Sequence, residues 1–169
     1  MWNWFNGVSS LFFIVSTWTA LENSKSFYFK CSSVVLVPVS YMCNASGFDP
    51  SFLLLDYTAI SMVGLSYLNN LYATAFFVSL AVCEYAKTGT LQKTARVTFG
   101  TAGALSLYRT YLYVDVWKGH QLLFSFTAAF FVFLGKIRCV NVQDRMGLQL
   151  TYLWHFTCTT ILCVAALTV

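Results

Sequence analysis

Charged residues are scarce in this chain. Asp, Glu, Lys and Arg make up 9% of its 169 residues, whereas hydrophobic residues make up 58%. Soluble domains carry about 25% charged residues, and so small a domain cannot bury this much apolar surface in one core. The few cations, with a net charge of only +4, also argue against a nucleic-acid-binding domain. The composition predicts a protein whose solvent is the lipid bilayer.

Common catalytic and redox motifs are also lacking. None of the six cysteines forms a CxxC pair, so zinc ribbons and thiol redox motifs are not indicated. We find no phosphate loop, haem attachment motif or serine nucleophile elbow. The N-terminus lacks the basic region and cleavage site of a signal peptide, so the first apolar stretch is expected to be a retained span. No repeat or linker divides the chain, which predicts one domain over residues 1–169.

The chain does contain long apolar stretches, which are separated by short polar connections. A bilayer-spanning helix needs about 17–25 mostly apolar residues. We therefore predict an all-α, polytopic transmembrane helical bundle of about seven spans. Six spans is the alternative, because the Asn69-Asn70 connection is very short and the first two stretches are brief. The predicted spans are residues 6–21, 29–44, 52–68, 71–86, 97–114, 120–136 and 148–168.

The cations are distributed unevenly between the two sides that seven spans define. One side, with the N-terminus, has six: Lys87, Lys93, Arg96, Lys136, Arg138 and Arg145. The other has Lys25, Lys30 and Lys118, and Arg109 can extend toward it. The positive-inside rule then places the N-terminus on the cytoplasmic or matrix-like side. Basic residues near a membrane surface attract anionic headgroups, so the predicted lipid-binding residues are Lys87, Lys93, Arg96, Lys136 and Arg138.

Polar residues inside the apolar stretches are the candidate functional residues. An ionisable group at this depth is costly and usually has a partner. The topology brings the end of the second span and the starts of the third and seventh to one membrane side. We therefore predict a polar intramembrane cluster, in which Asp56 pairs with His155 and locks the helices. Its members are Ser40, Asn44, Asp56, Thr151 and His155.

Small residues gather on the fifth predicted span. Such residues let helices approach closely in membranes, so this span is predicted to make a close helix contact. The residues are Gly100, Ala102, Gly103, Ala104 and Ser106.

Two segments resemble the CREST superfamily of seven-span membrane hydrolases, which includes alkaline ceramidases and TMEM8/myomaker-like proteins. The segments are SYMCNASGFDPSFLLLDYTAISMVGLSYL and TYLWHFTCTTILCVAAL. The family has Ser-xxx-His at the end of span two, an Asp early in span three and His-xxx-His in span seven. Its three histidines hold zinc for amide hydrolysis.

Carried over to this chain, the resemblance implies an incomplete zinc site. Asp56 matches the family Asp and His155 the second histidine of span seven, but Thr151 stands at the first. Tyr41, or Asn44 under a shifted alignment, replaces the span-two histidine. Under the first alignment, Val37 stands at the serine position.

The incomplete ligand set predicts a protein that is not an enzyme. Zinc catalysis needs three protein ligands and an open position, and Asp56 and His155 supply at most two. We therefore expect a pseudoenzyme that serves as a structural accessory subunit of a larger membrane complex. The preferred setting is a respiratory or ATP-synthase complex of the mitochondrial inner membrane, with an endomembrane as the alternative. Expected partners are other membrane subunits and the bilayer, without nucleic acid; no cofactor is expected, but bound phospholipid is, and cardiolipin would fit basic pockets.

Two alternatives remain at this point. The first is a CREST-like zinc-dependent lipid amidase in which Asp56 and His155 bind the metal. The second is a proton or solute transporter subunit in which Asp56, Glu84 and His155 form the route.

Overall fold

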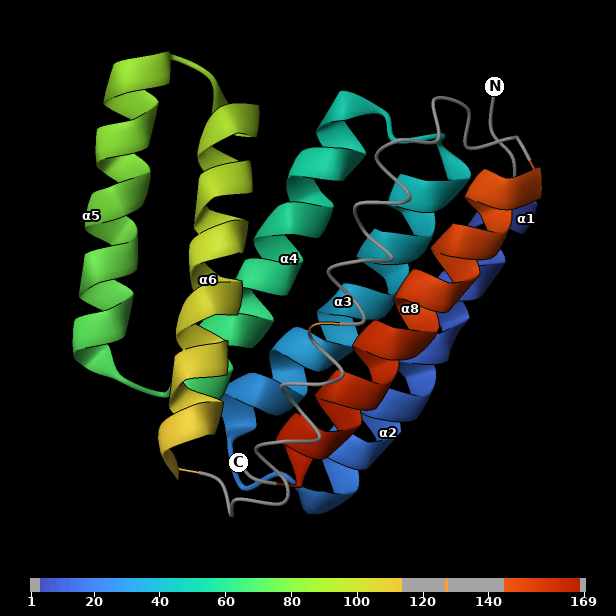
Figure 1. Ribbon diagram of the computed structural model, residues 1–169, viewed down its shortest axis with the longest axis horizontal. Coiled ribbons are helices and arrows are strands. Elements are labelled where there is room, and N and C mark those ends of the chain that lie inside the picture. Colours follow the sequence, from blue (N-terminus) through green and yellow to red (C-terminus); the bar gives the residue numbers. More distant parts are fainter. Residues whose placement is uncertain (1–3, 114–126, 128–144, 168–169) are drawn as a thin grey trace.

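The computed structural model describes residues 4–113, 127 and 145–167, and the secondary structure in these ranges is helical, without strands (Figure 1). The predicted all-α class is therefore confirmed. The sixth predicted span, 120–136, falls outside the described residues except for Thr127. The elements are α1 (Trp4–Gly7), the 3₁₀ helix η1 (Val8–Phe12), α2 (Phe13–Asn23), α3 (Phe27–Ala45), α4 (Pro50–Leu68), α5 (Leu71–Thr88), α6 (Leu91–Tyr113) and α8 (Arg145–Ala166).

Local capping explains where several helices begin and end. The Ser26 hydroxyl accepts a hydrogen bond from the Phe29 amide at the start of α3. Asp49 caps α4 in the same way through the Ser51 amide, and Pro50 occupies the first turn, where no amide donor is needed. Asn69 takes a left-handed conformation (φ 44°), which Asn tolerates better than most residues. Asn70 then caps α5, so the two-residue connection does separate two helices.

From α2 to α6, successive helices run in opposite directions, and α8 runs in the same direction as α6 (Figure 1). The α3–α4 and α5–α6 connections lie at the same end as the start of α8. The α2–α3 and α4–α5 connections lie at the other end, together with the end of α8. This is the alternation on which the predicted cluster depends, and it separates Lys87 and Lys93 from Lys25 and Lys30.

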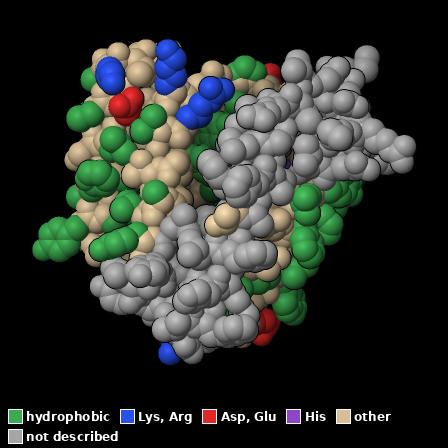
Figure 2. All heavy atoms as spheres, in the orientation of Figure 1, with side chains coloured by type: hydrophobic (Ala, Val, Ile, Leu, Met, Phe, Trp, Pro, Cys, Tyr) green, Lys and Arg blue, Asp and Glu red, His purple; other side chains and the backbone are tan. Residues whose placement is uncertain are grey.

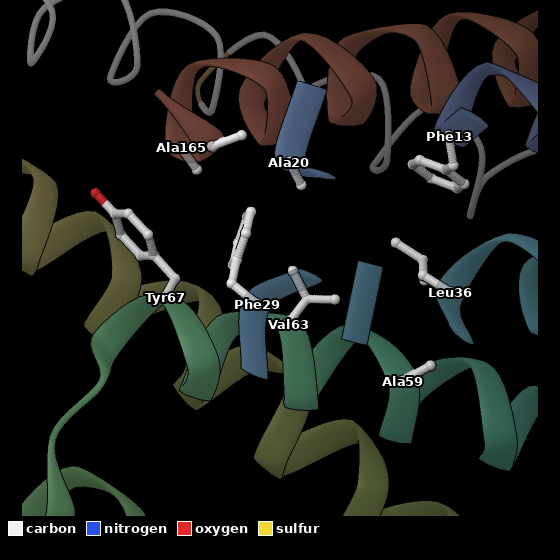
Figure 3. Packing of buried hydrophobic residues seen from close by; sticks show 9 residues of the cluster. Phe13, Ala20, Phe29, Leu36, Ala59, Val63, Tyr67 and Ala165 are labelled. Atoms are coloured by element: carbon white, nitrogen blue, oxygen red, sulfur yellow. The ribbon is translucent and has the colours of Figure 1, made fainter. Parts of the chain in front are cut away.

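The apolar core lies where α2, α3, α4 and α8 meet (Figure 3). It contains Phe13, Ala20, Phe29, Leu36, Ala59, Val63, Tyr67, Ala165 and Ala166. Helix α6 packs on α4, and α5 packs on α6 at the edge of the bundle. Phe77 is the buried residue that α5 contributes.

The contact between α4 and α6 is very close. A Cβ atom placed on Gly64 would lie 3.2 Å from the Cβ of Ala102 and 3.4 Å from the Oγ of Ser106. The predicted close contact of the fifth span is therefore made by Ala102 and Ser106. Gly100 and Gly103 are not part of it, since an added Cβ on either would meet nothing within 4 Å. Ala104 is exposed, so the small residues do not share one face.

Many polar side chains are buried beside the apolar core, and many large apolar side chains are exposed. Among the described residues, the buried ones include nine serines, four threonines, Asn44 and His155, while many large apolar side chains are exposed. Exposure reaches 85% for Tyr72, 80% for Leu71 and 66% for Trp18. Soluble proteins follow the opposite tendency. Figure 2 shows hydrophobic side chains along the flanks of the visible face and Lys and Arg side chains toward its ends.

Length and apolar character single out one described helix as able to cross a bilayer, and this helix is α4. Thr151–Ala166 of α8 is a shorter apolar stretch. The seven-span count therefore stays a prediction.

Candidate functional site

The candidate site is a buried polar cluster where η1, α3 and α8 meet. His155 is 3% exposed, and Ser9 and Ser10 are fully buried. Asn44, Ser40 and Thr151 are buried beside them, each at 2% or less. We refer to these six residues as the η1–α3–α8 cluster.

Helical register explains why α8 presents polar groups to this cluster. Residues four apart lie on the same face of a helix. Thr151, His155 and Thr159 follow this spacing, and all three are buried. The face of α8 that packs against η1 and α2 is therefore polar along much of its length.

Helix η1 reaches the cluster because the chain just before it passes very close to α3. A Cβ on Gly7 would lie 2.9 Å from ring carbons of Tyr41 on α3, so only glycine fits at this crossing. The chain then continues as a 3₁₀ helix, which is tighter than an α-helix and changes the direction of successive side chains. The result is that two consecutive serines, Ser9 and Ser10, are both buried.

Hydrogen bonds connect the members of the cluster. The Oγ of Ser9 lies 2.7 Å from Nδ1 of His155. On the other side of the ring, the Asn44 amide nitrogen lies 3.5 Å from Nε2. The same nitrogen donates to the Ser40 carbonyl at 2.8 Å and to the Ser10 hydroxyl at 3.2 Å. The Phe13 ring contacts the imidazole edge-on, with 5.3 Å between ring centroids.

The orientation of the Asn44 amide bears on the chemistry of His155. A backbone carbonyl can only accept, so the Ser40 carbonyl fixes the nearer amide atom of Asn44 as nitrogen. The two N–H groups of this nitrogen are directed at the Ser40 carbonyl and the Ser10 hydroxyl, which both lie nearer than Nε2 of His155. Which partner donates in the Ser9–His155 hydrogen bond therefore depends on the tautomer of the ring. Ser9 and His155 are both shielded from solvent, which suits a structural hydrogen bond better than a nucleophile–base pair that must reach a substrate.

The predicted site residues are partly brought together. Asn44 and His155 approach each other, Ser40 joins through its carbonyl, and Thr151 is buried one turn before His155. Asp56 is half-buried on α4, a helix that packs mainly against α3 and α6. The proposed pairing of Asp56 with His155 stays a prediction.

The predicted lipid-binding residues lie at one end of the bundle where they are described. Lys87, Lys93 and Arg96 are exposed near the α5–α6 connection. Lys136 and Arg138 fall outside the described residues. Glu84 is half-buried near the end of α5.

Ser9 and Ser10 were not predicted as site residues. The signal available was two adjacent hydroxyls in the otherwise apolar stretch FNGVSSLFF. An α-helical period points adjacent residues about 100° apart, so it gives no reason to bury both.

Within residues 4–113, 127 and 145–167, no three His, Cys, Asp or Glu side chains come together in a metal-binding arrangement. No protein-family model, curated protein or solved structure matches the chain.

Proposed function

We propose that this chain is an integral membrane protein with a structural, non-catalytic role. The observation that carries the proposal is the distribution of side chains, with many hydroxyls, an amide and an imidazole buried beside the apolar core and many large apolar groups exposed. In a bilayer, helices associate through close packing at small residues and through interhelical hydrogen bonds. The close Gly64–Ala102 contact and the η1–α3–α8 cluster are contacts of these two kinds.

Exposed aromatic residues toward the ends of the helices support embedding in a bilayer. Trp18, Tyr28, Tyr72 and Tyr108 are exposed toward the end with the α4–α5 connection. Trp4 and Tyr85 are exposed toward the other end. Trp and Tyr prefer the two membrane–water interfaces, so these two groups fit the two headgroup regions.

The short connections support a structural role. Residues 24–26, 46–49, 69–70 and 89–90 join α2 through α6, which leaves little protein outside a bilayer in that part of the chain. Ser9, His155, Asn44 and Ser10 hydrogen-bond within the η1–α3–α8 cluster, and the cluster is shielded from solvent. A bundle of this kind serves best as an accessory subunit of a larger membrane complex, for which the mitochondrial inner membrane remains our preferred setting.

Native gel electrophoresis of membranes solubilised in a mild detergent tests this role. We expect the tagged full chain to migrate with a complex much larger than itself. A single band at the size of the free chain in its detergent micelle would contradict the accessory-subunit role.

A membrane hydrolase is the second candidate, because Ser9 and His155 form a buried hydroxyl–imidazole pair. Their burial disfavours it. A serine-directed fluorophosphonate probe that labels the wild-type chain, but not Ser9→Ala or His155→Ala, would establish the hydrolase instead. Stoichiometric zinc that is lost in His155→Ala would equally favour an enzyme.

A further inference from the structure

An open hollow of about 440 Å³ lies where the start of α4, the end of α5 and the start of α6 meet. It forms because α4 and α5 both pack along α6 but hardly touch each other. Its volume falls in the range of about 300–1,000 Å³ typical of small-molecule sites. The lining includes Pro50, Ser51 and Leu54 from α4, Tyr85 from α5, and Thr90 and Gln92 next to or within α6.

Three exposed cations are close in sequence to residues that line this α4–α5–α6 hollow, although none of the three lines it. Lys87 lies two residues before Gly89, which lines the hollow, and Lys93 directly follows Gln92. Arg96 lies one helical turn after Gln92, on the same side of α6, and acts electrostatically on Tyr57 of α4. Figure 2 shows Lys and Arg side chains gathered at this end of the molecule.

Acidic groups also lie in this region, but they are less available than the cations. The Asp49 carboxylate accepts the Ser51 amide as the cap of α4. Glu84 and Asp56 are half-buried, whereas Lys87, Lys93 and Arg96 are all exposed. The accessible charge around the hollow is therefore mainly positive.

The surroundings of the hollow change from polar to apolar. Ser51, Thr90 and Gln92 offer hydroxyl and amide donors at the end of the bundle. Val82, one turn before Tyr85 toward the middle of α5, is an exposed apolar residue. A ligand that fits both regions has a phosphate group at one end and hydrocarbon at the other.

We propose that the α4–α5–α6 hollow binds the headgroup phosphate of an anionic phospholipid, whose acyl chains lie along the apolar exterior of α5. This proposal rests on the proposed function, because only a chain embedded in a bilayer meets lipid in this position. Lys93 and Arg96 supply the positive charge, and the hydroxyl and amide groups of the lining donate hydrogen bonds to the phosphate oxygens.

Lipid add-back to the purified full chain tests the site. The delipidated protein in neutral detergent is incubated with phosphatidylglycerol or phosphatidylcholine, and bound lipid is counted by native mass spectrometry. We expect preferential retention of phosphatidylglycerol. Lys93→Gln should weaken its binding about fivefold, which is the loss expected for one cation near an anionic headgroup. Lys25→Gln, the same change at the opposite end, should leave binding unaltered.

Three results would overturn this site. The first is an equal loss of phosphatidylglycerol binding in Lys93→Gln and Lys25→Gln. The second is equal binding of phosphatidylglycerol and phosphatidylcholine. The third is displacement of the lipid by free glycerol 3-phosphate, which would indicate a water-soluble ligand. Alkaline carbonate extraction separates this failure from failure of the proposed function. If the chain stays in the membrane pellet but does not bind phosphatidylglycerol preferentially, only the lipid site is wrong. If carbonate releases the chain, it is not an integral membrane protein.

Discussion

Ser9 and His155 are separated by 146 residues, yet the serine oxygen lies 2.7 Å from Nδ1 of the imidazole. This hydrogen bond joins the first helical segment to the last described one. Asn44 approaches the opposite edge of the ring and adds α3 to the same cluster. Three parts of the chain that are distant in sequence are therefore held together by polar groups out of contact with solvent.

Ser9→Ala should destabilise the bundle, because it leaves the buried Nδ1 of His155 without its serine partner. Interhelical hydrogen bonds in membrane proteins contribute about 0.6 kcal/mol on average and up to about 1.7 kcal/mol. We expect a loss near the upper value, measured as the free energy of unfolding in detergent. Ser79→Ala is the matched control, since Ser79 is exposed and donates to the Ala75 carbonyl of its own helix. Equal losses in the two variants would contradict a role for Ser9 in joining the helices.

Gly64→Leu should separate α4 from α6, because the new side chain would overlap Ala102 and Ser106. Overpacking of this kind costs about 1–3 kcal/mol. The control is Gly100→Leu on α6, where an added Cβ meets nothing within 4 Å. Both changes raise helix propensity equally, so the difference between the two unfolding free energies measures the contact. A Gly64→Leu variant as stable as Gly100→Leu would show that the two helices do not pack this closely.

Arg109 joins the ends of α4 and α6. Its guanidinium donates to the Tyr67 carbonyl and lies 5.1 Å from the centre of the Tyr67 ring. A cation at the C-terminal turn of a helix interacts favourably with its dipole, and a partly desolvated cation–π contact contributes about 1–2 kcal/mol. Arg109→Met should therefore lower the unfolding free energy more than Arg109→Lys, which keeps the charge. If thermal unfolding in detergent ranks the two variants the other way, the contact is not stabilising.

Much of the helical framework could be predicted from the sequence. The apolar stretches predicted helices whose first and last residues lie within a few residues of those of α3, α4 and α5. Asn69-Asn70 worked as a helix boundary because one Asn can adopt the left-handed conformation and the next can cap a helix. These are local properties, and local sequence is enough to reveal them.

The details of the site depend on tertiary contacts and were harder to predict. Residues 6–21 were predicted as one span, but the chain there changes from α1 to η1 to α2. The change follows from the close approach of Gly7 to Tyr41, which involves a residue far away in the chain. Depth along the helices suggested that Asn44 and His155 lie at a similar level, and the Asn44 amide nitrogen lies 3.5 Å from Nε2 of His155. Depth could not reveal that α4, which carries Asp56, packs mainly against α3 and α6.

Membrane-impermeant maleimide labelling tests the central claim, a bilayer-embedded antiparallel bundle, most directly. Lys25→Cys and Lys87→Cys place single reactive thiols at opposite ends of the bundle, in a background where the six native cysteines are replaced by serine. In sealed membrane vesicles, one position should react at once and the other only after permeabilisation. Reaction of both positions without permeabilisation would contradict the account.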